Sequence, residues 1–369
     1  MKKPLKITLI SLGAFLAVLL AGVLVFTGVY FTRFQTAGSI EKLTSYDDGY
    51  NLYRMDVKYN YSLDDVINYD ITDNQTMIDA VLNEALPMLP VSIKVPDFGC
   101  TAFTLTDTDG DVHMGRNYDF KNDSSGMLVY CTPKDGYKSV ACTALDNISA
   151  NVPDESIQKR LATLTAPFIC LDGINEKGVS IAVLTLDSEP VHQDTGKPVI
   201  ATTLAIRLVL DRAASTEEAV ELLRQYDMFA SSGRDYHFYI TDATGDGRVI
   251  EYDCESEARE FVATPINAIT NFYGLYKEKV LPNQKNGIYG HGRERYDAVL
   301  DVFEQQSGNY TDDTVWAALI AASQEPNPED ITSNTQWSIA YNNTDLTADI
   351  VLRRHWNDIT HYGLTTNET

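Results

Sequence analysis

The chain has 369 residues, of which 44% are hydrophobic and 22% are charged, a balance typical of a globular protein rather than a disordered or fibrous one. Its 29 Lys and Arg are outnumbered by 52 Asp and Glu, so the net charge of -23 repels phosphate backbones and nucleic acid is not an expected partner. Five cysteines without a CxxC pair argue against a disulfide-dense scaffold and against a Cys-based zinc site.

The first feature along the chain is an apolar run. Residues 7–32 contain no charged side chain and exceed the roughly 20 residues that a bilayer span needs. Lys2, Lys3 and Lys6 precede the run and Arg33 follows it, which predicts a cytoplasmic N-terminus with the rest of the chain outside the cell membrane. A cleaved signal peptide, and hence secretion, is the alternative. The run is longer than the usual apolar core of about 7–15 residues in such peptides, and no clear A-x-A site follows it.

Residues 34–99 form an acidic and polar segment after the predicted anchor. An apolar stripe over residues 77–86 predicts one amphipathic helix, with Thr72 or Asp73 as its cap. Each proline that follows removes a hydrogen-bond donor and disfavours helix at the preceding residue, which predicts an extended strap. The three prolines of the strap are Pro87, Pro90 and Pro96.

Beyond residue 100 the pattern predicts hairpins and helices in blocks. Alternating strands joined by turn-forming residues predict three hairpins. They pair 100–107 with 112–120, the two halves of 236–253, and 337–341 with 349–352. Helical periodicity covers 203–213, 216–225, 292–305 and 312–323, and Ser215 and Glu218 have the spacing of a capping box. This order predicts an α+β fold in which helices cover antiparallel sheets.

The motifs for metals and nucleotide cofactors are weak or missing. Asp107, Asp109 and Asp111 resemble the start of a calcium loop, but Gly110 is misplaced and Tyr118 stands where a bidentate Glu belongs. We interpret this segment as a solvated hairpin turn. The six histidines form no HExxH motif, and the chain has neither a GxGxxG after a strand nor a P-loop. We therefore expect no metal and no cofactor.

Cys100 has the most specific context of the five cysteines. It follows Gly99 at the end of the strap, and Arg116 and Asp119 come sixteen and nineteen positions later. A Cys released as an N-terminus carries its own base, because the α-amine has a reference pKa of about 7.7–8.0. Attack of the thiol on the Gly99 carbonyl would uncover that amine. Arg116 would then favour the thiolate by its charge, and Asp119 would orient the amine. The alternatives are a buried core thiol and a surface ion pair.

The stretch CTAFTLTDTDGDVHMGRNYDF resembles the start of the mature chain in the choloylglycine hydrolase, or linear amide C–N hydrolase, family. These N-terminal-nucleophile hydrolases include bile salt hydrolases and penicillin V acylases. The resemblance continues through 171–186, 236–253, 269–272 and 292–303. It implies a four-layer αββα sandwich over residues 100–369. The apolar run and its flanking charges predict the segments that precede this sandwich, an anchor in residues 1–33 and an extracellular pro-segment in 34–99.

The resemblance also implies roles for individual residues. Cys100 matches the nucleophile, Arg116 and Asp119 match the GRNxD pair beside it, and Asn271 matches the asparagine of the oxyanion hole. An oxyanion-hole donor of this kind contributes about 2.7–4 kcal/mol.

Two further positions are less clearly matched. Arg295 is the best match for the later active-site arginine, and Arg293 remains the alternative. Thr185 stands where bile salt hydrolases have an Asn, so only its backbone N–H is a candidate for the oxyanion hole. This departure weakens the expectation of bile salt substrates.

These observations predict an autoprocessed amidohydrolase that cleaves a linear, non-peptide amide of a small N-acyl compound through an acyl-enzyme on Cys100. Conjugated bile salts, penicillin V and N-acyl amines all remain candidate substrates. The alternative from another class is a catalytically inactive extracellular binding protein on the same fold. A papain-like protease is disfavoured, because no Cys signature of that family surrounds any of the five cysteines. The sequence does not indicate an oligomeric state.

Overall fold

The computed structural model describes residues 3–87, 89, 99–231, 233–285, 287–330 and 332–364, with side chains described from Phe15 onward. Pro90 and Pro96 of the predicted strap lie outside the described residues.

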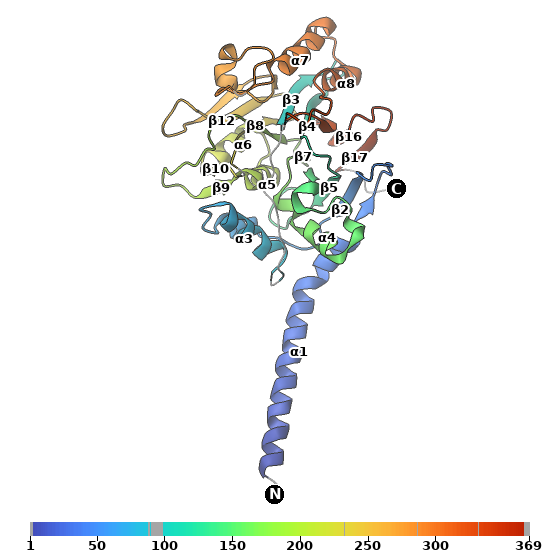
Figure 1. Cartoon of the computed structure of the whole chain (residues 1–369), viewed down its shortest axis with the longest axis vertical. Coiled ribbons are helices and arrows are strands. Elements are labelled where there is room, and N and C mark those ends of the chain that lie inside the picture. Colours follow the sequence, from blue (N-terminus) through green and yellow to red (C-terminus); the bar gives the residue numbers. More distant parts are fainter. Residues whose placement is uncertain are drawn as a thin grey trace.

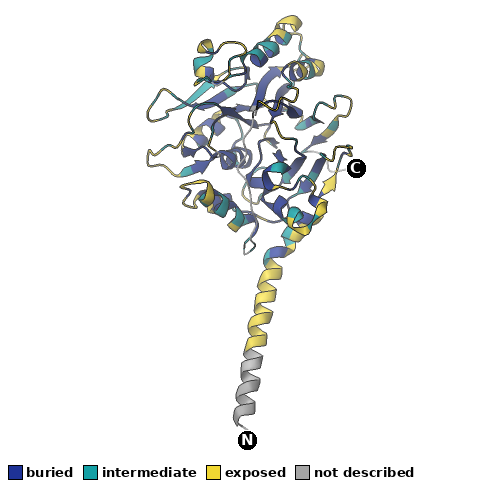
Figure 2. Cartoon of the chain, in the orientation of Figure 1, coloured by how far each residue is buried: buried dark blue, intermediate teal, exposed yellow. Residues whose placement is uncertain are grey.

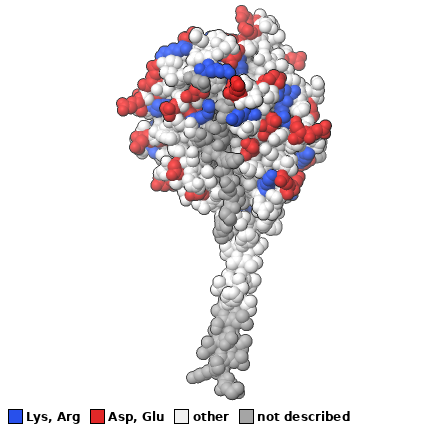
Figure 3. Space-filling view, viewed as in Figure 1, with Lys and Arg blue, Asp and Glu red and all other residues white. Residues whose placement is uncertain are grey.

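Helix α1 (Lys3–Gly38) extends away from the globular body formed by the rest of the chain (Figure 1). Its side chains are mostly exposed between Phe15 and Gly28, and they become buried only where the helix meets the body (Figure 2). Charged residues are scattered over the body, whereas the described part of the projecting helix is uncharged on the face in view (Figure 3). The stretch Phe15–Gly38 is long and apolar enough to cross a membrane.

The segment that follows α1 contributes both strands and helices. Asp73 caps α3 by accepting the N–H of Thr76, so the predicted helix and one of its two predicted caps are confirmed. Two strands in this segment were not predicted, because they are short and are joined by a long loop over residues 43–51. The elements are β1 (Glu41–Lys42), β2 (Leu52–Asp56), α2 (Leu63–Ile67) and α3 (Asn74–Ala85).

A nine-stranded sheet has the order β1-β2-β5-β6-β7-β8-β11-β12-β13. Its neighbours are antiparallel except for β2 and β5, which run parallel. The hairpin predicted over residues 236–253 is confirmed as β11 and β12. The remaining bounds are β5 (Gly126–Cys131), β6 (Ser139–Ala144), β7 (Asp172–Asn175), β8 (Ser180–Leu186), β11 (Asp235–Thr241), β12 (Arg248–Tyr252) and β13 (Phe261–Pro265).

A six-stranded sheet has the order β14-β3-β4-β15-β16-β17 and is antiparallel throughout. It contains the other two predicted hairpins, β3–β4 and β15–β16, which are therefore confirmed. A separate parallel pair is formed by β9 and β10. The bounds are β3 (Gly99–Thr106), β4 (Val112–Asp119), β14 (Ala268–Ile269), β15 (Thr335–Asn342), β16 (Thr347–Leu352), β17 (Thr360–Gly363), β9 (Val199–Ala201) and β10 (Asp227–Phe229).

Helices flank the two sheets on their outer sides. Helices α5 and α6 contact strands of the nine-stranded sheet, α7 and α8 contact strands of the six-stranded sheet, and β3 contacts β8 and β11 across the interface between the sheets. The four helices predicted beyond residue 200 are confirmed within a few residues at each end. The helical elements are α4 (Ile157–Ala162), α5 (Thr202–Arg212), α6 (Thr216–Leu223), α7 (Arg293–Gln306), α8 (Asp312–Ala321), and the 3-10 helices η1 (Leu145–Ile148), η2 (Pro153–Glu155), η3 (Thr163–Phe168) and η4 (Gly274–Lys279).

The core lies where the sheets face each other and where helices cover them. Every residue of β4 and of β8 is buried, because both faces of these strands are covered. The buried residues of β4 nevertheless include Arg116, Asn117 and Asp119. Burying such polar groups is costly unless they are paired, so their partners mark the part of the fold where chemistry is possible.

Candidate active site

Cys100 lies at the start of β3, where the chain enters the six-stranded sheet. It pairs in register with Tyr118, and Ala102 pairs with Arg116. Because alternate residues of a strand share a face, the side chains of Cys100 and Arg116 lie on the same face of the hairpin. Cys100 is completely buried. In this hairpin register, residues sixteen positions apart lie on the same face, so the thiol and the guanidinium project to one side of the sheet.

Asn271 binds the backbone of Cys100. It follows β14, whose Ile269 pairs with Ala102, so the chain continues alongside Cys100. The Cys100 N–H donates to Asn271 Oδ1 at 2.9 Å, and Arg295 Nη2 donates to the same oxygen at 2.7 Å. Since both partners are donors, the amide oxygen rather than the nitrogen must face them. The amide nitrogen, Nδ2, donates to the carbonyl of Thr185 at 2.8 Å.

Arg295, not Arg293, is the arginine that reaches Cys100. Its Nη1 lies 2.8 Å from the Cys100 carbonyl oxygen and 3.0 Å from Thr101 Oγ1. Arg293 instead bonds Asp297 at 2.8 Å and the Lys277 carbonyl at 2.9 Å.

The approach of Arg295 depends on a glycine at the start of α7. Gly292 has a φ of +82°, and a Cβ at this position would meet Arg295 Nη2 at 2.3 Å. Glycine therefore satisfies both the left-handed backbone and the close contact.

Asp119 is held next to this arginine by a set of hydrogen bonds. Its Oδ2 lies 3.4 Å from Arg295 Nη1 and accepts Gln324 Nε2 at 2.9 Å, and its Oδ1 accepts Thr335 Oγ1 at 2.6 Å. Asp119 also pairs in register with Gly99, so its carboxylate lies beside the Gly99–Cys100 junction. Sequence reasoning missed Gln324 and Thr335, which carry no local motif and lie more than 200 residues away from Asp119 along the chain.

Arg116 forms a buried ion pair that the sequence did not predict. Its Nε lies 3.3 Å from Asp172 Oδ2, and both side chains are fully buried. Asp172 also accepts Trp337 Nε1 at 3.0 Å and the Tyr341 hydroxyl at 2.6 Å. Burial raises the pKa of Asp172, while the charge of Arg116 opposes that shift. Arg116 Nη2 has no hydrogen-bond partner among the described residues.

Thr185 lies in β8, across from the Cys100 strand. Its carbonyl accepts Asn271 Nδ2, and the N–H of Val183, two residues earlier, points to Leu171 on the β7 side. In a β-strand the backbone groups of residues i and i+2 point to the same side, so the Thr185 N–H points to the same side of β8 as the Val183 N–H. The Thr185 carbonyl also points to this side, where it meets Asn271. This is the orientation that a backbone oxyanion donor would need.

The thiol of Cys100 is held neutral by its burial. Burial raises the pKa of the Cys100 thiol to about 12, although the charge of Arg116 acts in the opposite direction. Its nitrogen is part of a peptide bond and cannot accept a proton. The arrangement therefore brings together groups suited to nucleophilic chemistry around a thiol that is protonated in this structure.

A cavity of about 250 Å³ opens where β8 ends, immediately after Thr185, and is lined by residues 186–190, Gly233 and Arg234. A second cavity of about 110 Å³ shares Asp187 and Arg234 with the first. The second cavity is also lined by Lys285, His291, Glu329, Asp330 and Thr332. These cavities give a polar region beside the candidate site that could receive part of a substrate.

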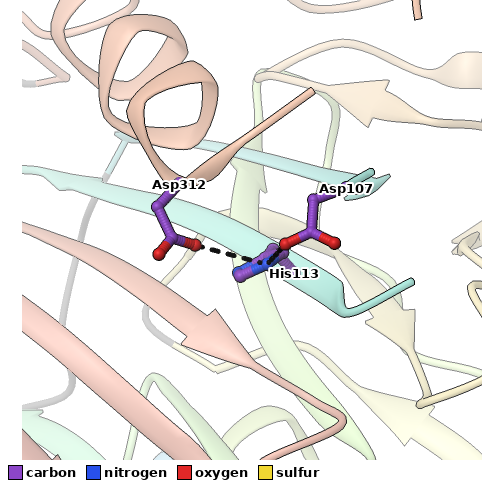
Figure 4. Close-up of side chains that lie close together, drawn as sticks. All are labelled: Asp107, His113 and Asp312. Carbon is purple, nitrogen blue, oxygen red and sulfur yellow. Dashed lines mark hydrogen bonds and ion pairs between the residues drawn. The ribbon is translucent and has the colours of Figure 1, made fainter. Parts of the chain in front are cut away.

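The structure contains one grouping with metal-ligand chemistry among its described residues, and it lies away from Cys100. His113 Nε2 is 3.0 Å from Asp107 Oδ2 and 3.5 Å from Asp312 Oδ1 (Figure 4). Asp107 Oδ1 accepts the N–H groups of Asp109 and Asp111, so this segment is the hairpin turn that we predicted. The hydrogen bond between His113 and Asp107 accounts for this pair without an ion.

Comparisons with known proteins agree with this geometry. Residues 100–258 match the model of the family described as linear amide C–N hydrolases, choloylglycine hydrolase family, which confirms the resemblance found in the sequence. The structure is similar to that of a mutant conjugated bile acid hydrolase from Clostridium perfringens, with a TM-score of 0.54, 17% identity, and coverage of 73% of this chain and 93% of that chain. It is also similar to penicillin V acylase from Agrobacterium tumefaciens, with a TM-score of 0.54, 17% identity, and coverage of 72% and 87%. At this identity the two structures establish a shared fold.

Proposed function

Since residues 100–258 match the model of the linear amide C–N hydrolases, choloylglycine hydrolase family, we propose that this chain is an autoprocessed cysteine amidohydrolase with Cys100 as its nucleophile. Residues 100–369 form the catalytic unit, with the αββα layering of an N-terminal-nucleophile hydrolase. The observation that carries the proposal is the set of contacts on the Cys100 backbone. Asn271 binds the nitrogen that would become the α-amine, and Arg295 binds the carbonyl of the same residue.

Maturation begins with the Gly99–Cys100 peptide bond. The Cys100 sulfur attacks the Gly99 carbonyl carbon, the C–N bond breaks, and the Cys100 nitrogen takes up a proton to become the free amine. Water then hydrolyses the thioester, which leaves Gly99 as a carboxylate and restores the thiol. Asp119, in register with Gly99, is placed to hold the new amine.

The mature enzyme then acts on an external amide by the same chemistry. The α-amine takes the thiol proton, the thiolate attacks the substrate carbonyl, and the negative oxygen is stabilised by Asn271 Nδ2 and the Thr185 N–H. The amine product leaves with a proton, and water hydrolyses the acyl-enzyme. Arg116, on the same face as Cys100, stabilises the thiolate by its charge. In the uncut chain Asn271 Nδ2 bonds the Thr185 carbonyl, so it must exchange this partner for the oxyanion.

On this proposal the uncut chain is inactive. Its Cys100 is buried, lacks the α-amine base, and has a thiol pKa of about 12. The inactive binding protein predicted as the alternative corresponds to a chain that never passes this stage.

We further propose that α1 anchors the protein in the cell membrane as a single span, with residues 1–33 as tip and anchor, residues 34–99 as an extracellular pro-segment and the catalytic unit outside. The exposed, uncharged residues 15–28 of α1 support this assignment, and the three lysines before the apolar run favour a cytoplasmic N-terminus. Removal of α1 as a signal peptide would instead release the protein.

The substrate class that we propose is a small N-acyl compound with a linear amide, such as a conjugated bile salt, penicillin V or an N-acyl amine. The charged cavities beside Thr185 favour a substrate with a polar group next to the amide. The two solved structures of similar fold are named for a conjugated bile acid and for penicillin V, so these compounds are the first probes.

The test uses the full-length protein in mild detergent with a glycine-conjugated bile acid, penicillin V and an N-acyl homoserine lactone. Product amines are quantified, and a rapid acid quench followed by mass measurement detects the acyl group on Cys100. Cys100→Ala is the control. We expect turnover of at least one probe and an acyl adduct on the wild type only. Turnover that persists in Cys100→Ala would refute the assigned nucleophile.

A further inference from the structure

The N-terminal segment is built into the nine-stranded sheet by strand pairing. Strand β2 runs parallel to β5, with Leu52 opposite Gly126 and Asp56 opposite Tyr130. Hydrogen bonds continue past the strand ends, from Gly126 N–H to the Asn51 carbonyl at 3.1 Å and from Val57 N–H to the Tyr130 carbonyl at 2.9 Å. The sheet edge at β5 is therefore completed by a segment that precedes the proposed cleavage site.

We propose that residues 34–87 remain bound to residues 100–369 as a non-covalent subunit after the chain is cut before Cys100, so that the mature enzyme stays attached to its anchor. The inference rests on the cleavage described under the proposed function. The partner of the β5 edge is thus the chain's own N-terminal fragment. The contacts that hold the segment are a strand pair and a set of buried tyrosines.

Side chains of the segment enter the core of the body. Tyr53 and Met55 on β2 are buried in the same hydrophobic cluster as the catalytic unit. The Tyr59 hydroxyl donates to the Leu164 carbonyl at 2.6 Å. The ring of Tyr61 lies edge-on to Phe168, with the ring centroids 5.3 Å apart. The segment therefore forms part of a common core rather than a surface strap.

Tyr61 also completes a buried charged network. Its hydroxyl donates to the carboxylate of Asp211 at 3.0 and 3.1 Å, and Asp211 pairs with the fully buried Arg207 at 2.7 Å. Loss of the segment would remove one partner of this carboxylate and open the network to water. Buried ionic groups are stable only when all their partners are present, so the body favours the docked segment.

Polar contacts also tie the segment to distant parts of the catalytic unit. Asp64 pairs with Arg212 at 2.7 Å, Asp48 pairs with Arg353, and the Tyr46 hydroxyl donates to Asp358 at 2.8 Å. These ion pairs are partly exposed and individually weak. Together they extend the interface over the surface of the catalytic unit, from α5 to the residues after β16.

The cleavage site lies outside this interface. Gly99 and Cys100 belong to β3 in the six-stranded sheet, whereas β2 belongs to the nine-stranded sheet. Cutting the Gly99–Cys100 peptide bond therefore removes none of the contacts between residues 34–87 and the catalytic unit. Release of the segment would also leave β5 as an open edge strand, with unpaired backbone groups next to the buried Met127 and Val129.

The same segment is attached to the anchor helix. Arg33, near the end of α1, donates from Nε to the Ala85 carbonyl at 2.8 Å and from Nη2 to the Glu84 carbonyl at 2.5 Å. The Tyr30 hydroxyl donates to the Pro87 carbonyl. Helix α1, α3 and β2 therefore act as one unit, and a catalytic unit bound to β2 stays where α1 is (Figure 1).

The test follows the full-length protein in cell membranes. After cleavage, residues 100–369 should remain in the membrane fraction through a high-salt wash and should co-purify in equal amounts with the N-terminal fragment in mild detergent. The fragments should separate in denaturant. Cleaved catalytic unit that appears in the soluble fraction without denaturant would overturn the inference.

A second arm separates this inference from the cleavage chemistry. A site-specific protease sequence replaces residues 91–97 in the Cys100→Ala variant, and the purified chain is cut there. If the wild type is never cut before Cys100, the proposed function fails, but the cut variant still tests the interface. Fragments that stay together support the docked subunit, and fragments that part in mild detergent refute it.

A matched pair of tyrosine variants tests the interface itself. Tyr61→Phe removes only the hydroxyl that reaches Asp211, whereas Tyr69→Phe removes a hydroxyl on an exposed side chain whose 3.4 Å hydrogen bond comes from Asn83 in the same segment. At a fixed low urea concentration, we expect Tyr61→Phe to release the catalytic unit about fivefold more at equilibrium, and Tyr69→Phe to match the wild type. Equal release from both variants would contradict the role of Tyr61.

Discussion

Replacing Asn271 with alanine separates catalytic loss from structural loss at the candidate site. The side chain makes three hydrogen bonds, of 2.9 Å from Cys100 N–H, 2.7 Å from Arg295 Nη2 and 2.8 Å to the Thr185 carbonyl. Truncation leaves these buried groups without a partner, at a cost of about 1–3 kcal/mol for each group that water does not reach. If Asn271 is also the oxyanion donor, kcat falls by a further factor of about 10²–10³.

Asn343→Ala is the matched control for this variant. Asn343 is also fully buried, and its Nδ2 donates to the Gly178 carbonyl and to Ser180 Oγ, both at 2.8 Å, away from Cys100. Truncation there should lower the melting temperature by a comparable amount and leave kcat near the wild-type value. The pair therefore shares the structural cost and differs only in the expected effect on turnover.

The assay measures kcat per cleaved site with the best linear amide from the probe set. Each preparation is normalised to the fraction of chains that begin at Cys100, because Asn271 also binds the backbone at the cleavage site. Thermal unfolding of both variants gives the structural cost. The oxyanion role of Asn271 is refuted if Asn271→Ala and Asn343→Ala have the same kcat per cleaved site.

Three other predictions address neighbouring groups. Arg295→Lys should lower kcat/KM by at least about tenfold, because an ammonium cannot make the forked contacts of the guanidinium, whereas Arg293→Lys should retain activity in the same assay. Asp172→Asn leaves the charge of Arg116 buried without its counterion and should lower the free energy of unfolding in urea by about 3–5 kcal/mol. Burial raises the pKa of Cys131 to about 11, so the folded chain keeps this proton while the unfolded chain releases it near pH 8.5. The stability that this thiol contributes is fully present below about pH 8.5 and should fall by up to about 1.4 kcal/mol per pH unit as the pH rises toward 11.

Each of these predictions has a control in the same chain. Equal activity of the two arginine variants would contradict the contacts assigned to Arg295. Asp349→Asn, at an exposed carboxylate paired with His361, should cost far less stability than Asp172→Asn, and similar costs would contradict the buried pair. Cys131→Val should show a smaller loss of stability between pH 8.5 and 11 than the wild type, and an unchanged slope would contradict the assigned thiol.

Local sequence patterns predicted the elements that carry Cys100 and Arg116. Alternation and turn chemistry gave the β3–β4 hairpin, and from it the shared face of Cys100 and Arg116 follows directly. The placement of Asn271 and Arg295 came only from the family resemblance, because these residues meet Cys100 across 171 and 195 positions of chain. The periodicity of hydrophobic residues within a single helix or strand carries no information about contacts between residues so far apart in the sequence.

The parts that sequence reasoning missed share this long-range character. Asp172 lay within a stretch that carried the resemblance, yet its pairing with Arg116 depends on how the two sheets face each other. Strand β2 was missed because it is short, and its parallel partner β5 lies more than 70 residues further along the chain. Gln324 and Thr335 stand outside any motif, and only the fold brings them to Asp119.

The central claim is that Cys100 becomes an N-terminal nucleophile by cutting its own chain. The most direct measurement is the intact mass and N-terminal residue of the purified full-length protein, compared with those of Cys100→Ala. The account predicts a break between Gly99 and Cys100 in the wild type and an unbroken chain in the variant. An unbroken wild-type chain, or a break that persists in Cys100→Ala, would contradict it.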